Sequence, residues 1–162
     1  PHAMTDTAIA TALAALQAKV GQQVHLSEWM TITQERVNAF ADATLDRQWI
    51  HVDVERAHRE SPFGAPIAHG FLTLSLMVPL RGLVEADKPI APGVRNVVNY
   101  GLNKLRFANP VRVGARIRGR FVLVAVEQVA PSVLQITEQY TAEIDGETKP
   151  ACIAESLMRL VF

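Results

Sequence analysis

The chain lacks the features that define several large classes of protein. Its single cysteine, Cys152, allows neither an internal disulfide nor a cysteine-based zinc site. Its 16 lysines and arginines balance 16 aspartates and glutamates, so there is no electrostatic reason to expect nucleic acid or a membrane surface as a partner. No stretch approaches the roughly 20 uninterrupted apolar residues of a membrane span.

The amino terminus shows no basic segment followed by a dense apolar block, so we expect no signal peptide. Pro1-His2-Ala3 before Met4 resembles an expression scar, and residues 4–162 are the part expected to fold as one domain. A lone cysteine in an apolar run suits a reducing compartment, so we expect a cytoplasmic protein. Cys152 is interpreted as a small core residue and not as a nucleophile.

The chain does have enough apolar material for one domain. Of its 162 residues, 49% are hydrophobic and 20% are charged, a balance typical of globular chains. A chain of this length can bury a full core without disulfides or metals. We find no repeat, low-complexity tract or linker that would divide it.

The first half of the chain reads as helices. Residues 5–19 are rich in alanine, carry larger apolar residues at helical spacing, and predict a helix that ends at Gly21. The hydroxyl of Thr33 can cap a second helix that ends near Thr44, and Asp53 can cap a short third one. Residues 68–84 are apolar on nearly every side, which predicts a long buried helix kinked at Pro79.

The second half alternates with the period of a strand. Strands are predicted over residues 97–107, with an interruption near Gly101, and over 115–129, 134–144 and 148–162. Asp145-Gly146 is a hairpin turn signal, and Glu138 falls on an otherwise apolar strand face. Helices followed by consecutive antiparallel strands form an α+β pattern. The simplest arrangement is a curved antiparallel sheet wrapped around the long central apolar helix.

The most reactive combination of residues lies between these halves. Asp46 and His51 stand in one predicted loop, where a carboxylate can accept a proton from water and an imidazole can exchange one near neutral pH. Gly70 lies at the start of the apolar helix, whose first amides have no intrahelical partner and could stabilise an enolate oxygen. Glycine would let a carbonyl approach the backbone. Together these residues predict a proton-transfer site that faces a carbonyl group.

Each of these residues also has a purely structural interpretation. Asp46 can be a turn former, His51 a satisfied core histidine, His69 a cap of the apolar helix, and Gly70 a point of close packing. Asp46, His51, Asp53 and His69 are legitimate metal ligands as a set. However, the two-histidine helix spacing of zinc hydrolases is missing, and we expect no metal.

Three arginines, Arg116, Arg118 and Arg120, are spaced along one face of a predicted strand. They can form a solvated face or contact the anionic phosphates of a ligand tail. The residues alone leave both interpretations open.

Several segments resemble a known family. They are Phe40-Ala41-Asp42-Ala43-Thr44-Leu45-Asp46, His51-Val52-Asp53, Pro62-Phe63-Gly64, Ile67-Ala68-His69-Gly70-Phe71-Leu72, Asn99-Tyr100-Gly101, Arg106-Phe107, Pro110-Val111 and Gly114. The pattern, which spans roughly residues 33–119, is similar to that of the MaoC-like dehydratases. These are the (R)-specific enoyl-CoA hydratases of the hot-dog fold, with nodulation protein N-like members.

The resemblance implies a fold, partners and roles for residues. The fold would be a hot dog, with the sheet wrapped around the helix that begins near His69, and the protein would be a homodimer that associates through its sheets. The acyl chain would enter a tunnel beside that helix while the CoA moiety reaches the surface. Asp46 and His51 would form the catalytic dyad, and the Gly70 amide would bind the thioester oxygen. Supporting roles would fall to Ser75 and Asn99; for His69, the residues themselves leave a supporting role open beside its interpretation as a cap.

The resemblance therefore implies a hydro-lyase of fatty acid metabolism. It would reversibly hydrate a trans-2-enoyl-CoA, or another enoyl thioester such as that of acyl carrier protein, to the (R)-3-hydroxyacyl thioester, without a cofactor. A hot-dog thioesterase and a non-catalytic acyl-CoA-binding module are the alternatives. One departure concerns Arg47-Gln48-Trp49-Ile50, because family members more usually have a small polar residue and a proline before the histidine. The rigidity of this loop and the preferred chain length are open on that account.

Overall fold

The computed structural model describes residues 2–162, and Pro1 of the predicted scar lies outside them. Its helices are α1 (His2–Gln17), α2 (Gln34–Thr44), α3 (Trp49–Val52), α4 (Val54–Glu60), α5 (Gly70–Ser75) and α6 (Met77–Leu80). Its strands are β1 (Gln23–Leu26), β2 (Met30–Thr31), β3 (Asn96–Arg106), β4 (Arg116–Ala130), β5 (Val133–Ile144) and β6 (Cys152–Val161). None of the helices in this range combines the length and hydropathy needed to cross a membrane.

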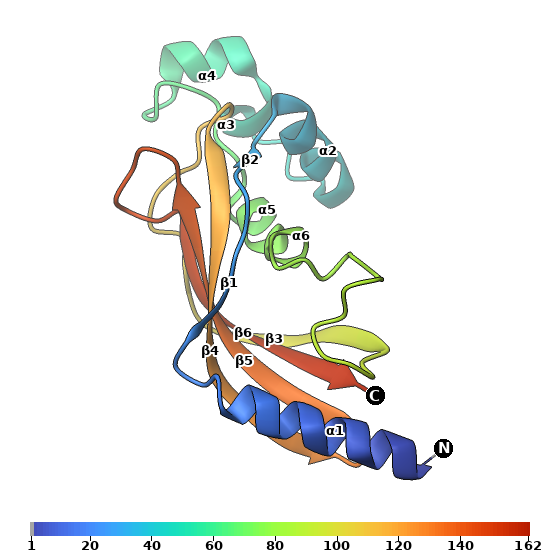
Figure 1. The fold of residues 1–162 in the computed structure, drawn as a ribbon. Helices are drawn as coiled ribbons and strands as arrows, with labels where there is room; N and C mark the ends of the chain where they lie inside the picture. Colours follow the sequence, from blue (N-terminus) through green and yellow to red (C-terminus); the bar gives the residue numbers. More distant parts are fainter. Residues whose placement is uncertain (1) are drawn as a thin grey trace.

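All strands belong to one antiparallel sheet in the order β1-β4-β5-β6-β3, with β2 added beside β4. The sheet curves around α5 and α6, whereas α1 lies along its other end and α2, α3 and α4 gather beyond the start of α5 (Figure 1). This arrangement confirms the predicted α+β class and the wrapped sheet. Within residues 2–162, no strand pairs with the outer side of β3, which is therefore an edge of the sheet.

The core has two parts that share the concave face of the sheet. Around α5 and α6, Leu76 and Leu80 pack with Phe121 and Tyr140. At the other end, Leu16 and other apolar residues of α1 pack against the ends of β5 and β6. Strand β5 alternates buried and less buried positions along its whole length, because successive side chains point to opposite faces. The predicted strand period is therefore confirmed.

The central helix differs from the prediction of one long apolar helix over residues 68–84. The helical segment is divided at Leu76 and ends at Leu80. Pro79 has no amide proton to give to the carbonyl of Ser75, and the division falls next to that carbonyl. Phe71 at its start is 63% exposed, so the segment is not buried on every side.

The early helices follow their capping signals. The Thr33 side chain accepts a hydrogen bond from the Arg36 amide at the start of α2, and Asp53 accepts one from the Arg56 amide at the start of α4. Helix α3 was not predicted, because four residues are too few for a periodic signal.

The predicted start of the last strand, at residue 148, was wrong. Gly146 has a positive φ of 81°, as its turn signal requires, yet β6 begins only at Cys152. The Asp145 amide bonds to the Arg116 carbonyl and the Ala151 amide to the Ala142 carbonyl, so a longer loop replaces a tight hairpin. Cys152 itself is fully buried, and burial raises the pKa of its thiol to about 11. It is the predicted core residue.

Candidate active site

Three segments that are separate in the sequence meet beyond the start of α5. The loop after α2 brings Asp46, α3 brings His51, and the residue that caps α5 is His69. A ligand atom of each side chain lies within 4.8 Å of one of each of the others. His51 is 6% exposed and His69 is 3% exposed, whereas Asp46 is half-buried. The predicted pair therefore does lie together at the start of the central helix.

Backbone contacts set the tautomer of His51. Its Nδ1 lies 2.6 Å from the carbonyl oxygen of Ile67. Because a carbonyl can only accept, Nδ1 of the neutral ring carries the proton and Nε2 keeps a free lone pair. Burial is the largest cause that lowers the pKa of His51 below 6.5; the Ile67 bond opposes it, and the neighbouring His69 adds to it. At pH 7 a neutral His51 can accept a proton.

His69 has the opposite tautomer. Its Nε2 lies 2.9 Å from the backbone carbonyl oxygen of Asp46, so Nε2 donates and Nδ1 of the neutral ring is unprotonated. This Nδ1 is buried and has no hydrogen-bond partner within residues 2–162. The ring stacks on His51 at a centroid distance of 3.8 Å and an interplanar angle of 24°, and it packs against Phe40 at 4.9 Å.

Asp46 keeps most of its carboxylate free. Its carboxylate accepts a hydrogen bond from Gln48, whose Nε2 donates to Oδ1 over 3.2 Å. An ionised carboxylate has about four lone-pair positions, so capacity remains to accept a proton from a water molecule. With the free Nε2 of His51 nearby, the site has two proton acceptors for one water.

Gly70 is the first residue of α5, and its amide is among those with no intrahelical partner. A Cβ at this position would lie 2.8 Å from the ring of Phe107, so close packing is one reason for glycine here. A cavity of about 300 Å³ opens beside it, lined mainly by apolar groups that include Phe63 and Phe107. An acyl thioester would find both an amide donor and an apolar wall at this point.

The weaker predicted candidates lie outside this cluster. Ser75 is exposed at the end of α5, and its hydroxyl donates to the Phe71 carbonyl over 2.7 Å. Asn99 is exposed on β3 opposite Met158, in the part of the sheet that packs under α1. The structure brings neither side chain to Asp46 and His51.

Sequence reasoning missed Gln34. Its Nε2 donates to the His51 carbonyl over 2.8 Å and to Asn38 Oδ1 over 2.9 Å, which ties α2 to α3. Phe40, at the back of His69, and Phe107, over Gly70, were also missed as parts of the site. Their roles depend on contacts between distant segments, so no local signal could have found them.

The three-residue cluster is a poor cation site despite its ligand types. The two imidazoles are stacked, and since ring lone pairs lie in the ring planes, stacked rings do not converge on one ion. One nitrogen of each ring is bonded to a carbonyl, so each ring has only its other nitrogen to offer a cation. Asp53, the fourth residue of the predicted metal set, caps α4 instead. The arrangement suits proton transfer better than metal binding.

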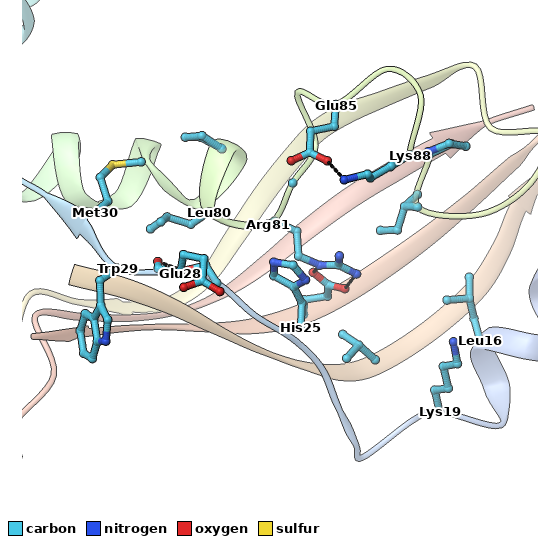
Figure 2. Close-up of a pocket in the computed structure, with 17 residues that line it drawn as sticks. Leu16, Lys19, His25, Glu28, Trp29, Met30, Leu80, Arg81, Glu85 and Lys88 are labelled. Atoms are coloured by element: carbon cyan, nitrogen blue, oxygen red, sulfur yellow. Dashed lines mark hydrogen bonds and ion pairs between the residues drawn. The ribbon is translucent and has the colours of Figure 1, made fainter. Parts of the chain in front are cut away.

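A larger cavity of about 600 Å³ lies at the other end of the central segment. Arg81 crosses it to Glu138, with Nε–Oε1 2.9 Å and Nη2–Oε2 3.0 Å, and His25 lines the same cavity (Figure 2). The Glu138 side chain is only 2% exposed. This bidentate pair explains the charged residue on the apolar strand face. None of the cluster residues lines this cavity.

The three arginines of β4 face acidic partners. Arg118 and Arg120 both donate to Glu143, over 2.8 and 2.7 Å, and Arg116 pairs with Asp145. Although burial raises the pKa of Glu143, the hydrogen bonds from Arg118 and Arg120 outweigh it and hold that pKa below its usual value. Because the three arginines are already paired, they are better interpreted as a solvated face of β4 than as a contact for the phosphates of a ligand.

The chain is similar to proteins of one family. The MaoC like domain matches residues 15–144. The 3-hydroxyacyl-thioester dehydratase Z of Mycobacterium tuberculosis is 51% identical over 149 residues, which cover 92% of this chain and 95% of that protein. The Nodulation protein N of Rhizobium leguminosarum bv. viciae is 44% identical over 150 residues, which cover 93% and 91%.

Solved structures of proteins from the same family have a similar fold. The (R)-hydratase from A. caviae involved in PHA biosynthesis superposes with a TM-score of 0.69 at 25% identity, covering 87% of this chain and 96% of that one. The MaoC-like dehydratase from Rhodospirillum rubrum has a TM-score of 0.66 at 23% identity, covering 88% and 92%, and shares the fold. With its sheet wrapped around α5 and α6, the chain has the hot-dog fold and belongs to the MaoC-like domain family.

Proposed function

We propose that the protein is a hydro-lyase that reversibly adds water to a trans-2-enoyl thioester and yields an (R)-3-hydroxyacyl thioester. The observation that carries the proposal is the buried His51, with a free Nε2, beside Asp46 and the first amide of the central segment. The dehydratase relative at 51% identity and the (R)-hydratase neighbour support the same reaction.

In this mechanism, one water molecule would be held between the Asp46 carboxylate and His51 Nε2. One of these groups takes a proton while the water oxygen bonds to the β carbon. The alkene electrons then move onto the thioester oxygen. As they return, the α carbon takes up a proton from the group that accepted it from the water, which restores that group. General acid–base help of this kind is worth about 10²–10⁴-fold in rate.

The Gly70 amide would donate to the thioester oxygen while it carries the enolate charge. Removing one such donor typically costs about 2.7–4 kcal/mol of transition-state stabilisation. The apolar cavity beside Gly70 would hold carbon atoms of the substrate next to this amide.

The substrate carries the electron-withdrawing group that this chemistry needs. The thioester already acidifies the α carbon, so we propose no cofactor. The thioester partner is CoA or acyl carrier protein, and neither Arg118 nor Arg120 is assigned to its phosphates, because both are engaged with Glu143. We also propose a cytoplasmic location, with which a single free cysteine is compatible.

We also propose that the protein is a homodimer formed through β3. This edge strand has an open hydrogen-bonding side and exposes Val98 and Tyr100 by 51% and 59%, which natural proteins seldom leave uncovered. Light scattering on the purified protein should give twice the chain mass, and Val98→Lys should lower it. A monomeric parent protein would refute this part.

One assay separates the reaction from its alternatives. The parent protein is mixed with crotonyl-CoA and longer trans-2-enoyl-CoAs, and the loss of conjugated thioester absorbance is followed together with a thiol-reactive dye. We expect absorbance loss without thiol release, and an (R)-3-hydroxyacyl product. Thiol release would indicate a thioesterase, which attacks the carbonyl carbon. Binding with no change in either signal across the series would indicate a non-catalytic module.

A further inference from the structure

The segment Ile67–His69 is a rigid support beside the candidate dyad. The Ala68 amide bonds to the Val111 carbonyl over 2.8 Å, and the Val113 amide bonds to the Pro66 carbonyl over 2.9 Å. A β-bridge joins Ile67 to Arg112. Paired to its neighbour in the manner of a strand, this segment can hold other groups in fixed places.

The His51 side of the dyad has several bonds to distant segments. The Ile67 amide donates to the Ile50 carbonyl over 3.0 Å, and the His51 ring donates to the Ile67 carbonyl over 2.6 Å. Gln34 adds a bond to the His51 carbonyl over 2.8 Å. This half of the dyad is therefore fixed both to the support and to α2.

The Asp46 side of the dyad has far fewer hydrogen bonds to distant segments. Its amide reaches only the nearby Thr44 hydroxyl at 3.3 Å, and the Arg47 amide reaches Leu45 at 3.1 Å. Leu45 itself has a positive φ of 67°, an uncommon conformation for a leucine. Within residues 2–162, the one hydrogen bond that ties 45–48 to a distant segment is from His69 Nε2 to the Asp46 carbonyl, 23 residues away.

His69 is well placed to act as a rigid spacer. Its ring is 3% exposed and packed between His51 and Phe40, so its rotation is restricted. Its Nε2 proton points at a backbone carbonyl and is not available to a substrate. One ring thus contacts His51 through its face and Asp46 through its edge.

We propose that His69 is a positioning residue, which sets the Asp46 carboxylate against His51 Nε2 by holding the Asp46 carbonyl. The bond does for this loop what a proline before His51 would do, namely limit its movement. The inference rests on the proposed function, in which both groups hold one water. Catalytic geometry is sensitive to displacement, since a misplacement of about 1 Å can cost roughly 10²-fold in rate.

Two substitutions of His69 separate this role from simple packing. The amide nitrogen of glutamine reaches about as far as imidazole Nε2, whereas that of asparagine reaches only the Nδ1 position. Both remove the stacked ring, so a loss of stability should be similar in His69→Gln and His69→Asn. Only His69→Gln keeps a donor for the Asp46 carbonyl.

The experiment compares kcat and KM for crotonyl-CoA hydration, with melting temperatures as the structural readout. We expect His69→Asn to lower kcat by about 10–100-fold with little change in KM, and His69→Gln to stay within about 3-fold of the parent kcat. If His69→Asn retains the parent kcat, or if both variants lose kcat equally, the positioning role is refuted.

Two further measurements keep this inference distinct from the proposed function. If Asp46→Asn and His51→Ala abolish hydration while His69→Asn does not, only the inference fails; if the parent never hydrates an enoyl thioester, the function fails. Nitrogen-15 NMR of labelled histidines tests the geometry without any activity. It should report a protonated Nδ1 for His51 and a protonated Nε2 for His69, and the reverse tautomer at His69 would refute the bond.

Discussion

Two buried polar groups lie at opposite ends of the α5–α6 segment and are satisfied in different ways. At one end, Arg81 and Glu138 form a bidentate pair in which each charge is matched by the other. At the other end, His51 and His69 each donate one ring N–H to a backbone carbonyl. The Asp46 carboxylate accepts one long hydrogen bond, from the side-chain amide of Gln48. The Arg81–Glu138 pair has little capacity to form further hydrogen bonds, whereas His51, His69 and Asp46 keep lone pairs that can accept them.

This difference separates structural from reactive polar groups in the same core. A buried pair that matches charge with charge contributes to the structure and is inert, since any other partner would have to displace an ion. A buried imidazole with a free nitrogen costs stability, and only a bound water or substrate would repay it. The comparison predicts that substitutions at the two ends act on different measurable quantities.

The largest effects are expected at the reactive end. Asp46→Asn and His51→Ala should each lower kcat for crotonyl-CoA hydration by about 10²–10⁴-fold, because each removes one acceptor of the water's protons. Asp46→Asn should keep a melting temperature close to that of the parent, whereas His51→Ala also removes a stacked, hydrogen-bonded ring and should lower it. Asp53→Asn and His58→Ala, which change the same residue types outside the cluster, serve as controls. Full activity in both dyad variants would overturn the site assignment.

At the paired end, the free energy of unfolding should change instead. Glu138→Ala leaves Arg81, whose side chain is 13% exposed, without its charge partner. This should destabilise the protein, by at most the roughly 3–5 kcal/mol typical of a broken buried pair. The double replacement Arg81→Met with Glu138→Leu removes both charges and should be close to neutral, as measured by denaturant unfolding. Equal losses in the single and double variants would show that packing, and not charge pairing, is the dominant contribution.

Gly70 offers a sharper test of close packing at the reactive end. The Cβ of Gly70→Ala would lie 2.8 Å from the Phe107 ring, and overpacking of this kind typically costs about 1–3 kcal/mol. A second substitution, Phe107→Leu, should recover part of the loss. Gly101→Ala, whose Cβ would meet no atom within 4 Å, is the matched control. Equal unfolding energies for both glycine variants would contradict the packing reason.

The smallest expected effect is a pH dependence. Burial lowers the pKa of folded His51 below 6.5, so the unfolded chain binds a proton there first as the pH falls. The contribution of neutral His51 to the free energy of unfolding is therefore fully present above pH 6.5. It is lost as the pH falls toward the lowered pKa of the folded state. His51→Ala should lose less stability than the parent between pH 7.5 and 5.5. An acid limb of kcat/KM above 6.5 would contradict a neutral His51.

The sequence predicted those parts of the site that depend on short-range order. Asp46 and His51 are close along the chain, and Gly70 opens an apolar run, so their types and spacing already suggested proton transfer. Likewise, Thr33 gave the start of α2, because a cap is a local feature. Such features require no knowledge of the tertiary structure.

The remaining features depend on contacts between distant segments. The bond from His69 to the Asp46 carbonyl spans 23 residues, and the pair of Arg81 with Glu138 spans 57; no periodicity encodes such partners. The early end of the central helix at Leu80 has a local cause instead. Gly82 has a positive φ of 81°, and the Gly82 and Leu83 amides bond to the Pro79 and Val78 carbonyls, which is a glycine cap that the apolar pattern hid.

The most direct test of the central claim sets the two ends against each other in one assay. The initial rate of crotonyl-CoA hydration is measured for His51→Ala and for the double variant Arg81→Met with Glu138→Leu, each with its folded fraction known. We predict a His51→Ala rate at least about 100-fold below the parent and a double-variant rate near the parent. Hydration that survives in His51→Ala but fails in the double variant would place the chemistry at the other end.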